Sequence, residues 1–359
     1  MSDFVAHTKP FFDQGEADAL LAVIKTRLVN EGDLVNKLVR YTAQLANSLG
    51  GVPTSSGTLA LHLAIKTLGV NTDDDEVVIP DFACRSLYDC IKMAGGTPVF
   101  CDINLEDYSL SIDSVRSRLH KNTRAIILPH MYGCPARIDD FLGLEISIVE
   151  DCAQTLGAAY RGGPVGSFGA LSCFSFEGSK LIAAGEGGVA LANSDILLQR
   201  LNALRYGLDG RFAYQYRLSN LIAAVAMIQL DKLPFMIERR RQIATIYRNE
   251  LRDLEDRGIL RLPNPSSERE SVWYRFVVVC NTDSADLIDF ANQKGILIRN
   301  PLPSGCLSKT YRDYAADNPN ARLLAANGAS LPIYPDLGDA DIAKVVDVIH
   351  SFYKSRRVL

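Results

Sequence analysis

Between about Val52 and Ala192, short apolar runs alternate with helical patterns, and this alternation limits the possible folds more than any other feature of the chain. The apolar runs lack a polar–apolar alternation, so we expect strands that are covered on both faces. These strands are expected at Glu76–Ile79, Pro98–Cys101, Ala125–Leu128 and Ile146–Val149, and helices at Thr58–Leu68, Ser86–Ala94 and Ile112–Leu119. The repetition of strand, helix and strand predicts an α/β fold with a largely parallel sheet and helices on both faces.

The length of the chain and a change of pattern near Pro234 predict two domains. A chain of 359 residues exceeds the size at which single cores stop growing. A charge-rich amphipathic helix is expected at Phe235–Leu254 as the connector between the domains. Beyond it we expect a strand at Val272–Val279 and helices at Asp286–Gln293 and Asp339–Tyr353. The predicted boundaries are residues 1–234 for a large domain with an N-terminal arm and residues 235–359 for a small C-terminal domain.

The composition argues against several classes of partner. With 47% hydrophobic residues, 22% charged residues and a net charge of −4, the chain has no basic excess that would favour nucleic acid or a membrane surface. The apolar stretch Leu221–Ile228 is far shorter than the roughly 20 residues that a bilayer requires. Met1–Phe4 does not begin a signal peptide. We therefore expect no partner among nucleic acids or membranes.

The cysteines and histidines indicate a reducing compartment and no metal centre. Eight cysteines are scattered without a CxxC pair, which is typical of reduced thiols and favours a cytoplasmic location. No two of the five histidines lie close together in the sequence, so a zinc site is not expected.

Polar residues follow the predicted strands, at the edge where ligands collect in such sheets. Asp151 comes directly after the strand Ile146–Val149, and Pro80 and His130 occupy similar positions. A buried carboxylate is costly unless it is paired, and a protonated pyridine nitrogen would be a fitting partner for Asp151. A helix cap or a structural ion pair is the alternative. His130 could contact a ligand or serve only the structure.

Ser55–Thr58 precedes a predicted helix and could bind a phosphate group. The start of a helix offers free backbone N–H groups and a partial positive charge. Gly57 would allow the close approach of an anion, Thr58 would add a hydroxyl, and Ser56 lies beside them. Simple helix capping is the alternative, because serine and threonine also favour that position.

Lys180 lies among small residues in a loop after the expected strand Leu171–Phe174. Lysine suits imine chemistry because its pKa falls on desolvation, although most lysines are solvated surface groups. Gly185–Gly188 predicts a tight turn into the next strand, and Ser175 could donate to a phosphate. An amine, a buried acid and a phosphate cradle are the parts that bind and use pyridoxal phosphate.

Taken together, these motifs resemble the DegT/DnrJ/EryC1/StrS sugar aminotransferases, a group of fold type I pyridoxal phosphate enzymes. The resemblance extends over nearly the whole chain and rests on Ser56–His62, Gly95–Asp102, Pro129–Gly133, Glu150–Gln154, Gly185–Gly188 and Ser330–Pro335. It implies a large domain with a mostly parallel seven-stranded sheet flanked by helices, and a smaller α+β C-terminal domain. It also implies a homodimer with each active site at the interface, an amino donor that is usually glutamate, and a keto-sugar or related cyclic ketone as acceptor.

The resemblance also assigns roles to individual residues. Lys180 would form the Schiff base and shuttle protons, Asp151 would pair with the pyridine nitrogen, and Gln154 would lie beside the ring near its oxygen. The phosphate would be bound by Gly57, Thr58 and Ser175, with Ser56 next to them. A related branch that dehydrates sugars has histidine in place of the lysine, so Lys180 favours transamination.

Three positions depart from the family pattern. Cys84 stands where the family has an aromatic residue stacked on the cofactor, a role that Phe82 or Tyr88 could take instead. Gln215 replaces the asparagine that reaches the phosphate of the partner subunit, and Asn300 lies in the place of a usual His-Tyr-Pro sequence. These departures leave two alternatives open: a dehydratase- or lyase-type reaction on the same cofactor, and a regulatory protein that binds the cofactor without catalysis.

Overall fold

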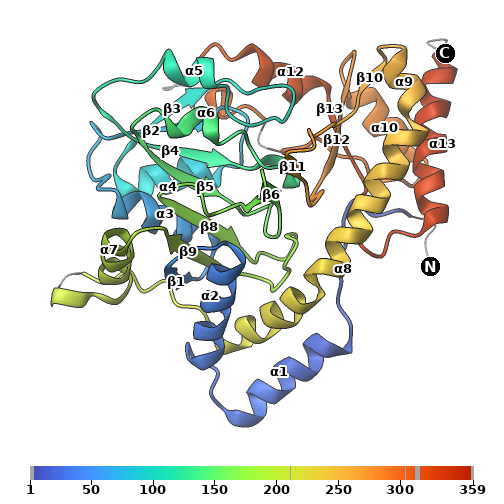
Figure 1. Ribbon diagram of the computed structural model, residues 1–359. Helices are drawn as coiled ribbons and strands as arrows, with labels where there is room; N and C mark the ends of the chain where they lie inside the picture. Colours follow the sequence, from blue (N-terminus) through green and yellow to red (C-terminus); the bar gives the residue numbers. More distant parts are fainter. Residues whose placement is uncertain (1–3, 211, 304, 312–315, 357–359) are drawn as a thin grey trace.

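The structure is a computed structural model, and it describes residues 4–210, 212–303, 305–311 and 316–356. Its main feature is a seven-stranded sheet, shown with its helices in Figure 1. In spatial order the strands are β1 (Gly50–Thr54), β9 (Gly188–Ala192), β8 (Leu171–Ser175), β5 (Ser147–Asp151), β4 (Thr123–Pro129), β2 (Glu76–Pro80) and β3 (Thr97–Cys101). Neighbouring strands pair in parallel from β8 to β3, and β9 is antiparallel to both of its neighbours. The prediction of an α/β fold with a mostly parallel seven-stranded sheet is confirmed.

Helices cover both faces of this sheet, which is why its strands are continuously apolar. On β8, Leu171 and Cys173 pack with the helices α3 (Gly57–Thr67), α4 (Ser86–Ala94) and α7 (Asp195–Tyr206). Phe174 points to the opposite face, where α2 (Asp33–Leu45) packs together with α8 (Asn220–Glu250). Shorter helices, α5 (Ile112–Arg116) and α6 (Asp139–Leu142), cover the far end of the sheet.

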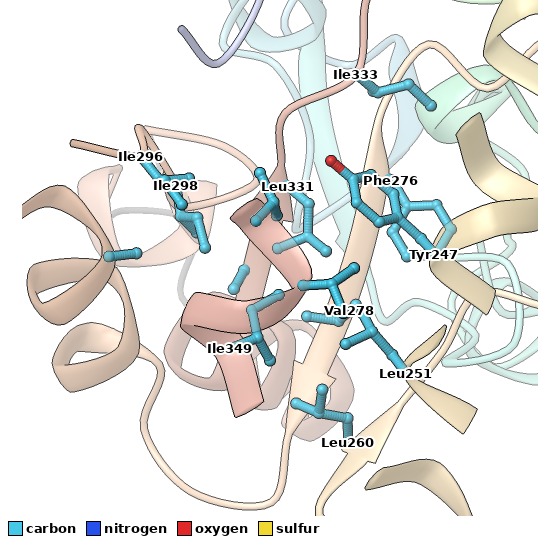
Figure 2. Packing of buried hydrophobic residues seen from close by; sticks show 14 of the residues in the cluster. Tyr247, Leu251, Leu260, Phe276, Val278, Ile296, Ile298, Leu331, Ile333 and Ile349 are labelled. Atoms are coloured by element: carbon cyan, nitrogen blue, oxygen red, sulfur yellow. The ribbon is translucent and has the colours of Figure 1, made fainter. Parts of the chain in front are cut away.

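The small C-terminal region has its own core, built on a three-stranded antiparallel sheet. Its strands are β10 (Leu260–Arg261), β12 (Phe276–Cys280) and β13 (Gly328–Leu331). Figure 2 shows Phe276, Val278 and Leu331 from this sheet packing with Tyr247 and Ile349. The helices of this region are α9 (Arg252–Asp256), α10 (Ala285–Gln293), α11 (Leu307–Thr310), α12 (Pro319–Asn327) and α13 (Asp339–Ser355).

The remaining elements are peripheral to both cores. An N-terminal helix, α1 (Gln14–Thr26), packs along α8. A third small sheet consists of β6 (Ala159–Tyr160), β7 (Gly163–Pro164) and β11 (Arg269–Glu270), and short 3-10 turns lie at Met131–Gly133 and Leu208–Gly210.

The long connecting helix differs from the prediction. It was expected to begin at Phe235, but α8 begins at Asn220, where Ser219 caps it, and continues through Pro234 to Glu250. Proline within a helix costs about 3 kcal/mol because it lacks an N–H and crowds the preceding turn. Apolar residues of α8 are buried in the large-domain core as far as Ile237, on both sides of Pro234, and in the small-domain core from Ile243 onward, which offsets this cost. Figure 1 shows the helix running from one region to the other.

Two other boundaries are also corrected. The strand expected at Val272–Val279 begins only at Phe276, because residues before it make hydrogen bonds to the large domain instead of to a strand. The helix expected at Ile112–Leu119 ends at Arg116. By length and composition, α8 alone among the helices of the described residues could cross a membrane, but 56% of that stretch is buried inside the molecule, as in a core helix of a soluble protein.

Candidate active site

A cavity of about 340 Å³ lies where β5 and β8 end and α3 begins. It brings together every predicted site residue except Gln215: Ser56, Gly57, Thr58, Cys84, Asp151, Gln154, Ser175 and Lys180. These residues come from four separate stretches of sequence, and the parallel sheet places them at one edge.

The start of α3 forms a tight cradle that fits a phosphate group. The hydroxyl of Ser56 accepts a hydrogen bond from the backbone N–H of Leu59 at 3.3 Å and so caps the helix. A side chain at position 57 would place its Cβ 2.7 Å from the Cβ of Ser175, so only glycine allows β8 to approach this helix start. The Thr58 hydroxyl donates to the hydroxyl of Ser86 at 2.9 Å. Capping and anion binding are compatible here, because a single cap leaves other N–H groups of the first turn for a ligand.

Asp151 is the last residue of β5, and its carboxylate has few donors. One oxygen accepts a hydrogen bond from the backbone N–H of Ala153 at 3.1 Å. Burial raises the pKa of Asp151 above its ordinary value, and this effect outweighs the N–H of Ala153 and the nearby Lys180, which lower it. A carboxylate in this state is suited to a cationic N–H partner, so the site fits the protonated pyridine nitrogen of pyridoxal phosphate.

Lys180 follows β8 in a loop that glycines hold in a fixed shape. Gly185 and Gly187 have φ values of 90° and 128°, which favour glycine, and the N–H of Gly178 donates to the carbonyl of Gly185 at 3.0 Å. The predicted glycine-dependent turn is therefore present. Burial alone lowers the pKa of Lys180, but the electrostatic effect of the acidic side chains around it, Tyr274 first, raises that pKa above its ordinary value.

Gln154 has one defined orientation. Its side-chain oxygen accepts a hydrogen bond at 2.8 Å from the backbone N–H of Tyr132, so the amide nitrogen is left to donate to a ligand. Tyr132 has a φ of 57°, an uncommon value for a residue of its size. Strain of this kind gathers at functional sites, and here it aims the N–H that orients Gln154.

His130 serves the structure. Its Nδ1 accepts a hydrogen bond from the N–H of Ala136 at 2.9 Å, and its Nε2 therefore donates to Glu150, also at 2.9 Å. His130, Glu150 and Cys152 form a group close enough to hold a metal ion. Both ring nitrogens are already engaged, however, and burial raises the pKa of the Cys152 thiol well above its ordinary value, so that thiol is a poor ligand.

Comparison with known proteins agrees with this geometry. The sequence profile of the DegT/DnrJ/EryC1/StrS aminotransferase family matches residues 11–350. The chain belongs to this family. The family consists of aminotransferases that depend on pyridoxal phosphate, so the chain is an enzyme of this class and its cavity is the expected cofactor site.

Relatives and solved structures support the same assignment. GDP-perosamine synthase of Vibrio cholerae is 30% identical over 96% of this chain and 98% of its own length. The structure of DesV from S. venezuelae is 26% identical, with a TM-score of 0.88, over 98% of this chain and 99% of that one. The aminotransferase TlmJ from Streptoalloteichus hindustanus has a TM-score of 0.91 at 22% identity, over 98% of this chain and 99% of that one, which shows a common fold.

The position of the aromatic residue usual in this family holds Cys84, which lines the cavity. Its thiol lies 3.4 Å from the hydroxyl of Ser86. Neither suggested substitute lines the cavity: Phe82 is fully buried elsewhere, and Tyr88 stacks on Tyr311 with ring centroids 3.5 Å apart. Within the described residues, a thiol therefore takes the place of the stacked ring.

Gln215 lies away from the cofactor cavity of its own chain. It lines a second cavity together with Glu31, Arg205 and Arg217, and its side-chain oxygen accepts a hydrogen bond from Arg217 at 2.9 Å. The family role predicted for this position acts on the partner subunit, and the placement of Gln215 is compatible with that role.

Several residues of the site were missed in the sequence. Glu177, Ser179 and Glu186 also line the cavity, and Tyr274 lies beneath Lys180, whose Nζ is 5.4 Å from the centroid of the tyrosine ring. The first three stand within or beside the motifs around Lys180 and Gly185, so their position in the sequence could have identified them. Tyr274 gave no such signal, because it stands in an apolar run that indicated only a strand.

Proposed function

We propose that this enzyme transfers an amino group from glutamate to a keto-sugar, typically a nucleotide-linked one, with Lys180 as the residue that binds the cofactor covalently. The observation that carries the proposal is the meeting of Lys180, Asp151 and the phosphate cradle of α3 in one cavity. Pyridoxal phosphate supplies an aldehyde that condenses with amines and a ring that accepts electrons.

Each wall of the cavity has a separate task in this proposal. The first turn of α3, with Gly57 and Thr58, and the hydroxyl of Ser175 on β8 bind the phosphate group. The carboxylate of Asp151 binds the ring nitrogen and keeps it protonated. The amide nitrogen of Gln154 donates toward the ring oxygen, because its own oxygen is already held by Tyr132.

Lys180 moves the protons. When an amino donor has displaced it, its free Nζ can take the α-proton of the donor as a base and return it as an acid. The loop that turns at Gly185 and Gly187 places this amine within the cavity. The same amine would serve the second half of the reaction, in which the ketone receives the amino group.

The choice of substrate class rests on the relatives. A relative that matches almost the entire chain is named GDP-perosamine synthase, and the family comprises sugar aminotransferases. Glutamate as the donor follows the family pattern. The reaction is proposed to occur in the cytoplasm, in a homodimer in which Gln215 of each subunit reaches the phosphate bound by the other.

The decisive experiment identifies the lysine chemically. The enzyme carrying its cofactor is reduced with borohydride, digested and mapped by mass spectrometry, and the cofactor is expected on the peptide that contains Lys180. Lys180→Ala should lose turnover, measured as 2-oxoglutarate formed from glutamate with a nucleotide-linked keto-sugar, by at least about 10³-fold while the fold is retained.

A matched control separates this effect from a general effect of removing a lysine. Lys37 is exposed on α2, and Lys37→Ala should be labelled and should turn over like the unaltered enzyme. Label on another lysine, or normal turnover by Lys180→Ala, would contradict the assignment. Absence of 2-oxoglutarate in the unaltered enzyme would exclude glutamate as the donor.

A further inference from the structure

Tyr274 lies against the reactive lysine, although it comes from a segment about a hundred residues further along the sequence. Its side chain is 6% exposed, and its ring faces Lys180, with Nζ 5.4 Å from the ring centroid. A cation at this distance is attracted by the negative face of an aromatic ring. Tyr274 does not belong to the predicted cofactor-binding residues. Its contact with the site is through Lys180.

The hydroxyl of Tyr274 is held by two neighbours. It lies 3.3 Å from the hydroxyl of Ser179, the residue before Lys180, and it accepts a hydrogen bond from Nη2 of Arg275 at 3.3 Å. Ser179 in turn donates to the carboxylate of Glu177 at 2.5 Å. The phenol is thereby coupled to the lysine loop on one side and to a guanidinium on the other.

Arg275 is itself fixed by the N-terminal arm. Its Nη1 donates to Nδ1 of His7 at 2.7 Å, and Nε2 of His7 lies 3.0 Å from the hydroxyl of Ser330. Burial, followed by the charge of Arg275, lowers the pKa of His7 to about 3, so the imidazole is neutral and can accept. Among the described residues no carboxylate forms an ion pair with Arg275, so its positive charge acts on the hydroxyl of Tyr274.

The backbone around Tyr274 is also held in place. Arg240, buried on α8, donates to the carbonyl groups of Trp273, Tyr274 and Ile333 at distances of 2.9–3.3 Å. The N–H of Arg275 donates to the carbonyl of Tyr132 at 3.1 Å. Trp273 has a φ of 52°, which is uncommon for a bulky residue. A strained, fully anchored segment of this kind is typical of a functional position.

The electrostatic effects on Lys180 and Tyr274 favour the charged form of each residue. The groups that raise the pKa of Lys180 against the effect of burial are, in order, Tyr274, Cys84, Asp151 and Glu177. Burial raises the pKa of Tyr274, but Lys180 first and then Arg275 outweigh it, together with the side-chain hydrogen bonds to Ser179 and Arg275, so that the pKa falls below its ordinary value. Arg240 and Tyr132 are the other charged or titratable groups that face Tyr274.

We propose that Tyr274 is a positioning residue for Lys180: its ring face and its fixed hydroxyl hold the side chain in the cavity and stabilise the ammonium form that arises when the released amine takes up a proton. This inference rests on the proposed role of Lys180 and adds a device that controls its charge. A lysine released by the amino donor would be held close to the reacting carbon, and the proton that it takes from that carbon would be kept for the step in which it acts as an acid.

The test measures the amine directly in the full-length protein without cofactor. Acetic anhydride labels only the unprotonated amine, so the labelling rate of Lys180, followed by peptide mass spectrometry, reports its protonation. In Tyr274→Phe, which keeps the ring, we expect the titration of Lys180 to shift down by about one pH unit, so that labelling at a pH of about 8.5 becomes roughly tenfold faster. Ser179→Ala should shift it in the same direction by less.

The control is Tyr353→Phe, which removes a buried hydroxyl in the small-domain core and should leave the labelling of Lys180 unchanged. An unchanged rate in a folded Tyr274→Phe protein, or an equal shift in Tyr353→Phe, would overturn the proposal. Ser179→Ala provides the same reading if Tyr274→Phe does not fold. Because the measurement needs no glutamate and no sugar, a failure of the proposed transamination would leave its outcome intact.

Discussion

Glu150 and Asp151 are adjacent on β5, carry the same functional group and have opposite environments. Both oxygens of Glu150 accept hydrogen bonds: the backbone N–H groups of Phe168 and Gly169 donate to one, and Gly166 N–H and the ring of His130 donate to the other. These bonds outweigh burial, and the pKa of Glu150 lies below its ordinary value. Asp151 has a single backbone donor, and its pKa is raised.

The difference shows how the sheet separates an acid that is satisfied within the protein from one that is left open to a ligand. Side chains alternate across a strand, so Glu150 and Asp151 point to opposite faces of β5. Glu150 anchors residues 166–169, which lead directly into β8 and so to Ser175 and Lys180. Asp151 faces the cavity with most of its hydrogen-bonding capacity unused. Glu150, whose hydrogen bonds are all made within the protein, fixes the backbone that brings Asp151 and Lys180 together.

Of the effects that distinguish the two acids, the largest concerns the rate and falls on Asp151 alone. Asp151→Asn removes the charge that would keep the ring nitrogen protonated, and turnover should fall roughly 10²- to 10³-fold, the usual effect of removing an electrostatic group from an active site. Steady-state kinetics with glutamate and a keto-sugar would measure the loss. Asp113→Asn on α5 is exposed and should have no effect. A rate unaffected by Asp151→Asn would remove this residue from the mechanism.

The second prediction concerns stability and falls on Glu150. Glu150→Ala leaves three backbone N–H groups and the ring of His130 without their acceptor in a buried site, which should lower the free energy of unfolding by about 3 kcal/mol. Denaturant unfolding of the protein without cofactor would measure this loss. Asp151→Asn in the same assay should cause no loss, because burial of the Asp151 carboxylate is unfavourable. Equal losses from the two variants would mean that the contrast between the two acids is not real.

Most of the fold could be predicted from sequence because the buried strands between residues 76 and 149 are continuous apolar runs. The exception is instructive. Pro234 indicated a boundary at which a new helix would begin. The helix α8 instead runs through Pro234, because burial of its apolar residues in the two cores stabilises it. Tertiary packing of this kind cannot be seen in a local pattern.

The candidate site also contains residues that could be predicted from the sequence and residues that could not. Lys180, Asp151 and Gly57 could be predicted because each belongs to a short motif next to a strand or a helix start. Tyr274 could not, because its role depends on Arg275, His7 and Ser179, which are brought together only by the fold. The division of tasks between Glu150 and Asp151 was also hidden, since it depends on which side of β5 each one faces.

The smallest effect is a difference in how the two acids respond to pH. The lowered pKa of Glu150 means that its stabilising contribution is complete above its ordinary pKa and disappears as the pH falls through the lowered value. The raised pKa of Asp151 acts in the opposite sense: its contribution is complete below its ordinary pKa and is lost as the pH rises through the raised value.

Without cofactor, Asp151→Asn should therefore be more stable than the unaltered protein at neutral pH, and this gain in stability should shrink in acid. Glu150→Gln should be less stable than the unaltered protein at neutral pH, and this loss of stability should also shrink in acid. Thermal unfolding from about pH 3 to 8 would measure both trends. If the stability differences of the two variants from the unaltered protein changed in the same direction with pH, the opposite pKa shifts of the two acids would be contradicted. Addition of pyridoxal phosphate should abolish the gain from Asp151→Asn, because only the carboxylate can pair with the ring nitrogen.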